Sequence, residues 1–344
     1  MVVVSTAYHL VLAHLLPGDE RFPGRTLLVL TGRREQIARV REAMTAADCH
    51  PFDAIESTTA EGPDVPAELA RRRALCALDA HTRAARVVVF NDQGADIQAL
   101  CRAARARGAR VLCGEDGGAA YSQRSFRARW RRHMHRVARF GPWVRNPVVP
   151  GAAPGAQATL AVFPHLLRPE LRARPPLALG LDRVPDFLRL SWTTAFLREL
   201  GLSAADLVFD EVYAPTYSGA IRHRDELRAV LREHLRMALS AGHACAVKYH
   251  PRERGDYLDA AALGATVLPA ALPVEFVYQA SAGRLRTVYG DSGTALLSAR
   301  WLAPQARAVS AMAFTGVHDP RFAEVLSSLA VEFLPGPDGA TART

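Results

Sequence analysis

Two adjacent carboxylates stand in a glycine-rich turn about a third of the way along the chain. The turn covers residues 114–118, where Glu115 and Asp116 precede Gly117, and it follows the run 110–113, which we interpret as a buried strand. A carboxylate at the carboxyl end of a strand can act as a general base, because proton transfer needs only reach and a suitable pKa. The alternative is a polar turn in which Glu115 or Asp116 caps the next helix.

A histidine followed by a proline ends another predicted strand, at 243–247. Pro251 restricts the backbone of His250, and the basic residues Lys248 and Arg252 flank the pair. A protonated imidazole among basic side chains suits a phosphate, because it can neutralise or protonate the departing oxygen. A surface strand end with ordinary basic residues is the alternative.

A third group of polar residues, Ser292, Gly293 and Thr294, precedes a helix predicted over 294–302. Hydroxyls and backbone N–H groups at a helix start can bind an anion, and an N-cap by Ser292 or Thr294 is compatible with that role. Glu275, near the start of a short predicted helix, could accept the two ribose hydroxyls of a nucleotide. It could equally be a favourable charge at a helix N-terminus.

These motifs need a scaffold that gathers strand ends, and the alternation of short β-branched runs with helical patterns predicts one. The rhythm indicates an α/β protein with two Rossmann-like domains that face a cleft, where Asp116 on one side meets His250 on the other. Strands are predicted at 2–4, 27–30, 87–90, 111–113, 207–209, 244–249, 266–268, 286–289 and 308–309, and helices at 33–44, 66–80, 95–107, 223–240, 274–280 and 294–302.

The length of 344 residues predicts two domains, each large enough for its own core. We place the first domain at 1–180 and the second at 181–335, with a frayed tail at 336–344. The proline-rich segment 147–185 is interpreted as the interdomain connection, with one or two short elements.

Several common sites are missing from the sequence. The chain has no GxGxxG, no P-loop motif and no Asp-x-Asp, and no two of its five cysteines have CxxC spacing. We therefore expect neither a cofactor nor a metal, and we disfavour dinucleotide-binding and P-loop enzymes.

The formal net charge of +9 predicts attraction to polyanions, which include nucleic acid, anionic lipid, acidic polysaccharide and nucleotide sugars. A basic nucleic-acid-binding protein is thus an alternative of a different class, although no recognised nucleic-acid motif is present and we expect no such partner. The start lacks the pattern of a signal peptide, and no apolar run approaches a membrane span of about 18 residues. A cytoplasmic, soluble protein is expected.

Taken in order, the motifs resemble those of bacterial GT-B sialyltransferases, above all the lipooligosaccharide sialyltransferases and the capsule polysialyltransferases. That group has an acidic-acidic-Gly motif, then a His-Pro motif, then a Ser/Thr motif before a helix, which here are residues 115–117, 250–251 and 292–294. The opening residues 5–10 also resemble the group's first strand and loop. The group often has paired hydroxyls where this chain has Ser292-Gly293-Thr294, so a GT-B-like transferase or epimerase for another nucleotide sugar remains an alternative.

The resemblance implies an inverting, metal-independent transfer of sialic acid, or a related nonulosonic acid, from a CMP-linked donor to a glycan hydroxyl. The first domain would take the acceptor and the second the nucleotide sugar. Asp116, or its neighbour Glu115, would deprotonate the acceptor, and His250 would act on the CMP phosphate. The implied donor-binding residues are Gly117, Lys248, Pro251, Arg252, Glu275, Ser292, Gly293 and Thr294.

The segment 124–139 is strongly basic and has apolar residues at helical spacing. We predict that Arg127, Arg131 and Arg132 steer an anionic glycan or glycolipid acceptor, or that the segment rests on the anionic inner face of a membrane. A solvated helix whose apolar stripe packs on the domain core is the alternative.

Overall fold

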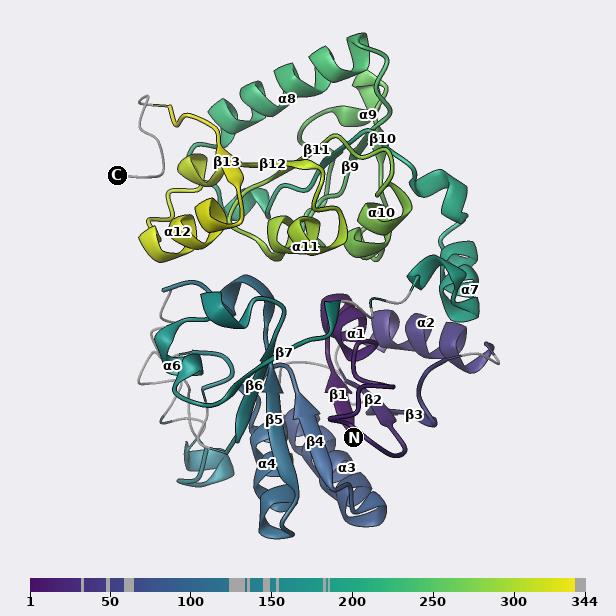
Figure 1. The fold of residues 1–344 in the computed structure, drawn as a ribbon, viewed down its shortest axis with the longest axis vertical. Helices are drawn as coiled ribbons and strands as arrows, with labels where there is room; N and C mark the ends of the chain where they lie inside the picture. Colours follow the sequence, from purple (N-terminus) through teal and green to yellow (C-terminus); the bar gives the residue numbers. More distant parts are fainter. Residues whose placement is uncertain are drawn as a thin grey trace. The chain divides into compact units, whose positions relative to one another are not determined.

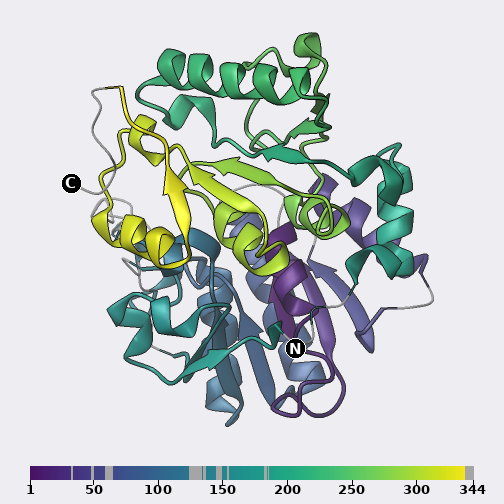
Figure 2. The same cartoon turned by 45° about the horizontal axis from the view of Figure 1, so that its top comes forward.

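The computed structural model divides into two compact α/β units, Met1–Pro185 and Asp186–Thr344 (Figures 1 and 2). The residues that it describes are 1–31, 34–47, 50–58, 65–123, 134, 137–144, 149–152, 155–181, 184 and 186–337. The predicted α/β class with two Rossmann-like units is confirmed. The division lies at 185/186, five residues after the position expected from the sequence. No described helix is long and apolar enough to cross a membrane.

The first unit is built on a parallel sheet whose strand order is β3-β2-β1-β4-β5-β6-β7. At its centre Val3 pairs with Val29 on one side and with Val89 on the other. The central strands are almost wholly apolar because a parallel sheet is covered by helices on both faces. The strands are β1 (Val2–Val4), β2 (Leu27–Thr31), β3 (Ala54–Thr58), β4 (Arg86–Val89), β5 (Arg110–Gly114), β6 (Ala158–Ala161) and β7 (Pro176–Ala178).

The helices of the first unit lie in the connections between these parallel strands. The chain leaves β1 toward β2 and β3, then returns through the long α3 to β4 and continues to β5. The helical segments are α1 (Ala7–Ala13), α2 (Arg34–Thr45), α3 (Val65–Thr82), α4 (Ala95–Ala106), η1 (Gly117–Ala120), η2 (Pro164–Leu166) and α6 (Pro169–Arg172).

The second unit has its own parallel sheet, in the order β10-β9-β8-β11-β12-β13. Its strands are β8 (Glu211–Tyr213), β9 (Cys245–Val247), β10 (Thr266–Val267), β11 (Thr287–Gly290), β12 (Arg307–Ser310) and β13 (Val331–Phe333). Its α-helices are α7 (Ser191–Glu199), α8 (Arg224–Ser240), α9 (Ala260–Leu263), α10 (Val274–Ala280), α11 (Thr294–Leu302) and α12 (Pro320–Ser328), and its 3-10 turns are η4 (Phe187–Arg189), η5 (Ala204–Leu207), η6 (Ser218–Ala220) and η7 (Met312–Phe314).

Two sequence-based assignments are corrected by these elements. The strand predicted at 207–209 is wrong, because Ser203 and Asp206 form a capping box that turns 204–207 into a 3-10 helix, and the strand begins at Glu211. The proline-rich segment 147–185 is not merely a connection, since it contributes β6 and β7 to the first sheet. Pro176 is tolerated because β7 is an edge strand and pairs only with β6.

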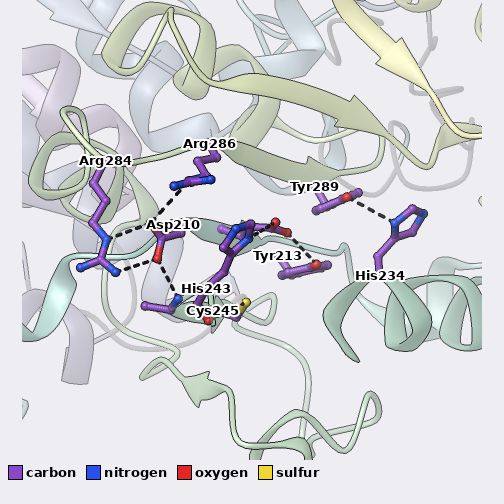
Figure 3. Close-up of polar contacts among 10 residues, drawn as sticks. Asp210, Tyr213, His234, His243, Cys245, Arg284, Arg286 and Tyr289 are labelled. Carbon is purple, nitrogen blue, oxygen red and sulfur yellow. Dashed lines mark hydrogen bonds and ion pairs between the residues drawn. The ribbon is translucent and has the colours of Figure 1, made fainter. Parts of the chain in front are cut away.

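The amino end of the second sheet is held together by a buried carboxylate (Figure 3). Asp210, just before β8, accepts two hydrogen bonds from the Arg284 guanidinium at 2.9 and 2.7 Å and one from the Ala244 N–H at 2.8 Å. The neighbouring Glu211 accepts from the Tyr213 hydroxyl at 2.9 Å and contacts His243 Nδ1 at 2.9 Å. These contacts join the starts of β8, β9 and β11, so they fix the strands whose opposite ends carry the predicted donor residues.

Candidate active site

The candidate site of the first unit lies where the strand order reverses. The chain builds the sheet outward from β1 in one direction and from β4 in the other (Figure 1). Ligands of such sheets bind at the carboxyl ends of the strands beside the reversal. Here those ends carry residues 5–9 after β1, Phe90 and Asn91 after β4, and Glu115 and Asp116 after β5.

Asp116 is held at both carboxylate oxygens. His9 Nε2 lies 2.9 Å from Oδ1, and the Asn91 side-chain amide donates to Oδ2 at 2.8 Å. The side chain of Asp116 is 26% exposed, whereas that of His9 is 1% exposed. Asp116 is therefore accessible to a substrate, whereas His9 is not.

The two residues that hold Asp116 are themselves oriented. Ser5 Oγ lies 3.2 Å from His9 Nδ1, and Asn91 Oδ1 accepts the Gln93 N–H at 2.9 Å. Since Oδ1 of Asn91 is occupied by a donor, its NH₂ group must be the one that faces Asp116. The two side chains that hold the Asp116 carboxylate are thus themselves held by further hydrogen bonds, His9 by Ser5 and Asn91 by the Gln93 N–H.

An aromatic ring supports the imidazole. Phe90 stacks on His9 with ring centroids 5.1 Å apart and an interplanar angle of 15°. Phe90 in turn lies against Gly114, where a Cβ atom would stand 2.3 Å from two atoms of the ring. The glycine before the acidic pair is required for this close approach. Gly117 has φ of 55°, which turns the chain sharply after Asp116.

Glu115, although adjacent, lies in a different environment. It is buried, and its carboxyl accepts hydrogen bonds from the hydroxyls of Tyr8 and Tyr121 and from the Val162 N–H at 2.8 Å. Burial raises the pKa of Glu115 to about 7, although the hydrogen bonds that it accepts oppose the rise. Its partners come from α1, from the loop after β5 and from the end of β6, so Glu115 ties these segments together beneath Asp116.

The second unit gathers its predicted residues at the carboxyl edge of its own sheet. The loop after β8 contacts the loops after β9 and β11: Thr216 N–H donates to Asp291 Oδ2 at 2.8 Å, and Ser218 N–H donates to Glu253 Oε2 at 2.8 Å. The His-Pro loop and the Ser292 loop therefore lie on either side of the end of β8, beside the point where this strand order also reverses.

His250 is half-buried at this edge. Its Nδ1 accepts the Arg252 N–H at 3.1 Å, which leaves the hydrogen of the neutral ring on Nε2. Burial, and then the charges of Arg252 and Lys248, lower the pKa of His250. The ring is thus neutral at pH 7, and it can act as a hydrogen-bond donor through Nε2–H. Pro251 and Arg252 are exposed beside it.

Lys248 and Glu275, both predicted to bind the donor, lie in the interior of the second unit. The Lys248 ammonium donates to the carbonyl oxygens of Tyr249 at 2.9 Å and Ala270 at 3.1 Å, and burial lowers its pKa to about 8. Glu275 is buried, accepts the Ser298 hydroxyl at 2.7 Å, and has its pKa raised by burial. Lys248 thereby fixes the 268–273 loop through Ala270, and Glu275 links α10 to α11 through Ser298. Their donor-binding roles stay predictions.

Ser292, Gly293 and Thr294 are partly buried at the start of α11. Gly293 is the N-cap residue with extended backbone and makes no side-chain cap, while Asp291 Oδ1 accepts the Ser292 N–H at 2.6 Å beside this helix end. The first N–H groups of a helix lack partners within it, which suits an anion. The role of this motif also stays a prediction.

Sequence reasoning missed four residues of the first site: Tyr8, His9, Asn91 and Tyr121. A signal for His9 was the pair Ser5-Thr6 before a helix, since Thr6 is the N-cap of α1 and accepts the His9 N–H at 3.1 Å. Asn91 directly follows a predicted strand. Arg127, Arg131 and Arg132, predicted to contact the acceptor, lie outside the described residues.

A cavity of about 590 Å³ lies elsewhere in the first unit, between α4 and Trp143, Gly155 and Ala156. Arg102, Arg105 and Asp92 are among its lining residues, and neither Glu115 nor Asp116 reaches it.

The fold is similar to that of solved enzymes of nucleotide-sugar chemistry. An α/β-galactoside α-2,3-sialyltransferase from Photobacterium phosphoreum matches with a TM-score of 0.58 and 11% identity over 96% of this chain and 97% of that chain. UDP-GlcNAc 2-epimerases match comparably, one from Neisseria meningitidis bound to UDP-GlcNAc (TM-score 0.56, 13% identity, 97% and 86% of the chains) and one from Methanocaldococcus jannaschii (0.56, 12%, 97% and 88%). No family model and no curated protein sequence matches the chain.

At these identities the comparisons establish the fold, which is the GT-B type of two Rossmann-like domains. The predicted fold class is confirmed. Sialyltransferases and epimerases share this fold, so the choice between them depends on the chemistry of the site.

Proposed function

We propose that this protein is a glycosyltransferase that moves a sugar from a nucleotide-linked donor to a hydroxyl, with Asp116 as the general base. The observation that carries the proposal is the state of Asp116: a partly exposed carboxylate at the strand reversal, held at both oxygens by oriented donors. Glu115 lies beside it in the sequence but is buried and fully engaged. A carboxylate that is fixed and accessible is suited to proton abstraction.

In the proposed reaction Asp116 takes the proton of the acceptor hydroxyl while that oxygen forms a bond to the anomeric carbon. The bond between this carbon and the donor phosphate oxygen breaks, and its electron pair leaves on the phosphate. The nucleophile and the leaving group occupy opposite faces of the sugar, so the configuration inverts. Asp116 afterwards releases its proton to water.

The residues of the second unit would bind the departing phosphate. His250 can donate through Nε2–H, and the first turn of α11, which follows Ser292, Gly293 and Thr294, would be the second group of donors; the Ser292 N–H itself donates to Asp291 Oδ1 at 2.6 Å. A single phosphate carries less charge than a diphosphate, so these neutral donors suit a nucleoside monophosphate leaving group. The missing Asp-x-Asp motif fits the same conclusion.

For the finer assignment, we propose CMP-linked sialic acid, or a related nonulosonic acid, as the donor. The order of the three motifs supports this choice, as does the sialyltransferase match over nearly all of both chains. The acceptor would be an anionic glycan or glycolipid, reached at the cytoplasmic side of a membrane, because the chain carries a net charge of +9.

A donor screen tests both levels of the proposal. Purified protein is incubated with CMP-sialic acid and with UDP-linked sugars, with and without acceptor glycans, and products are identified by mass spectrometry. Release of CMP together with a new glycoside supports the sialyltransferase. Transfer from a UDP-sugar keeps the glycosyltransferase and removes the sialic acid assignment.

A UDP-GlcNAc 2-epimerase is the second candidate, because several solved structures with TM-scores above 0.5 have that description. An epimerase would invert C2 of UDP-GlcNAc without any acceptor. Formation of UDP-ManNAc in the acceptor-free arm of the screen would establish it and exclude the transferase.

A further inference from the structure

His9 has a partner at each ring nitrogen, although it is buried on the first turn of α1. Nε2 lies 2.9 Å from Asp116 Oδ1, and Nδ1 lies 3.2 Å from Ser5 Oγ. One face of the ring is covered by Phe90, 5.1 Å away. The imidazole is thus enclosed on an aromatic ring, and its polar edge points to the candidate base.

The partners determine which nitrogen carries the hydrogen. An ionised carboxylate can only accept, so His9 Nε2 is the donor to Asp116. In the neutral ring Nδ1 is then an acceptor, and a hydroxyl such as that of Ser5 can donate to it. The chain Ser5–His9–Asp116 therefore has one consistent set of hydrogen positions while Asp116 is charged.

We propose that His9 is the positioning residue for Asp116: its Nε2–H holds Oδ1 so that, with Asn91 on Oδ2, the remaining lone pairs of the carboxylate face the acceptor hydroxyl. This inference rests on the proposed function of Asp116 as the base. His9 does not itself meet the substrate, because its side chain is 1% exposed. It acts by limiting the rotation of Asp116 and by stabilising the charged carboxylate.

A neighbouring histidine provides a matched control. His14 follows α1, is also buried, and its Nδ1 contacts the Leu10 carbonyl oxygen at 2.8 Å. It also contacts the ring of Phe52, with centroids 4.9 Å apart. A substitution of His14 therefore reports the cost of losing a buried imidazole near α1 whose contacts include Leu10 and Phe52.

The kinetic test compares His9→Ala, His9→Gln and His14→Gln, with the donor that the wild type turns over. We expect His9→Ala to lower kcat about 10- to 100-fold with the acceptor KM changed less than about 3-fold, since a small misplacement of a catalytic group has effects of this size. His9→Gln can place an amide N–H near the position of Nε2 and should recover most of kcat.

A merely structural His9 predicts a different pattern, in which His9→Gln and His9→Ala are equally impaired, or His14→Gln loses as much kcat as His9→Ala. Either result would overturn the proposal. If the wild type turns over no donor, the proposed function is removed instead. The measurement in the next paragraph then tests whether His9 donates a hydrogen bond to Asp116.

That measurement is independent of activity. Nitrogen-15 NMR of the histidine rings in the full chain at neutral pH identifies the His9 signals by their loss in His9→Gln. We expect a hydrogen on Nε2 and none on Nδ1. Both signals should shift in Asp116→Asn, because one accepting carboxylate oxygen is then replaced by an NH₂ group. A ring protonated on Nδ1 alone, or His9 chemical shifts that stay the same in Asp116→Asn, would contradict the inference.

Discussion

His9 Nε2 lies 2.9 Å from Asp116 Oδ1, although 107 positions separate the two residues in the chain. They meet because β1 and β5 are the two neighbours of β4, and the loops that follow parallel strands emerge at the same edge. Asn91, from the end of β4 between them, holds the second oxygen. The loops after three adjacent strands thus contribute one residue each to this cluster: His9 after β1, Asn91 after β4 and Asp116 after β5.

The two acids of the turn should behave differently when each is replaced by its amide. Asp116→Asn is expected to lower turnover about 10²-fold or more, the scale of one general base. Glu115→Gln should retain turnover within about 5-fold, because burial raises the pKa of Glu115 to about 7 and the carboxyl is already largely engaged. Steady-state kinetics on both variants checks this, and the opposite ranking would assign the base to Glu115.

The same pair makes a prediction for stability. The folded-state pKa of Glu115 lies above its ordinary value of 4.5, so the folded protein holds a proton that the unfolded chain releases between about pH 4.5 and 7. The wild type should therefore lose stability relative to Glu115→Gln as the pH rises through that window. Denaturant midpoints measured across it test the sign, and a difference that does not change with pH would show that folding does not raise the pKa of Glu115.

His250→Ala is expected to leave a folded protein with turnover about 10²-fold lower. Because burial and then Arg252 and Lys248 lower the pKa of His250, the ring acts in its neutral form, as a donor through Nε2–H. The ratio of wild-type to variant kcat should then stay flat between about pH 7 and 8.5. A ratio that falls about tenfold over this range would indicate that imidazolium is the acting species.

Gly114→Ala should impair the site through the ring of Phe90, which supports His9. The added methyl group would stand 2.3 Å from the Phe90 ring, which is buried and stacked on His9. We expect a loss of about 1–3 kcal/mol in unfolding free energy, together with lower kcat, because the ring of Phe90 must shift and it supports His9. Thermal melts and kinetics check this. Gly108→Ala, at a glycine with φ of 83° and open space around it, is the control that strains the backbone without touching Phe90.

The basic segment predicts a salt-sensitive acceptor KM. Replacing Arg127, Arg131 and Arg132 with Ser should raise the KM several-fold at about 50 mM salt, and the difference should shrink near about 0.5 M because ions screen exposed charges. A control with the same loss of charge replaces the exposed Arg172, Arg189 and Arg236. An unchanged KM in the first variant, or an equal change in the control, would remove the steering hypothesis.

Much of the framework was accessible from the sequence, because it depends on local patterns. Apolar β-branched runs need two covered faces, so they identify β1, β2, β4, β5 and β11, and the helices α10 and α11 begin and end where the 3.6-residue period predicts. The edge elements were harder to find. β3 has only two apolar residues, Ala54 and Ile55, and β7 starts with a proline, so the signals of both strands are weak. α12 was not predicted, although Asp319 and Pro320 mark its start.

The sequence by itself determined that a carboxylate pair, a His-Pro pair and a hydroxyl motif each end a strand in an α/β chain. Only the tertiary structure decided that Asp116 is the accessible acid and Glu115 the buried one, because burial and hydrogen-bond partners depend on residues far away in the chain. The structure also added His9 and Asn91, whose roles arise from the order of strands in the sheet rather than from their neighbours in the sequence. The meeting of Asp116 with His250 stays a prediction, since each belongs to a different unit.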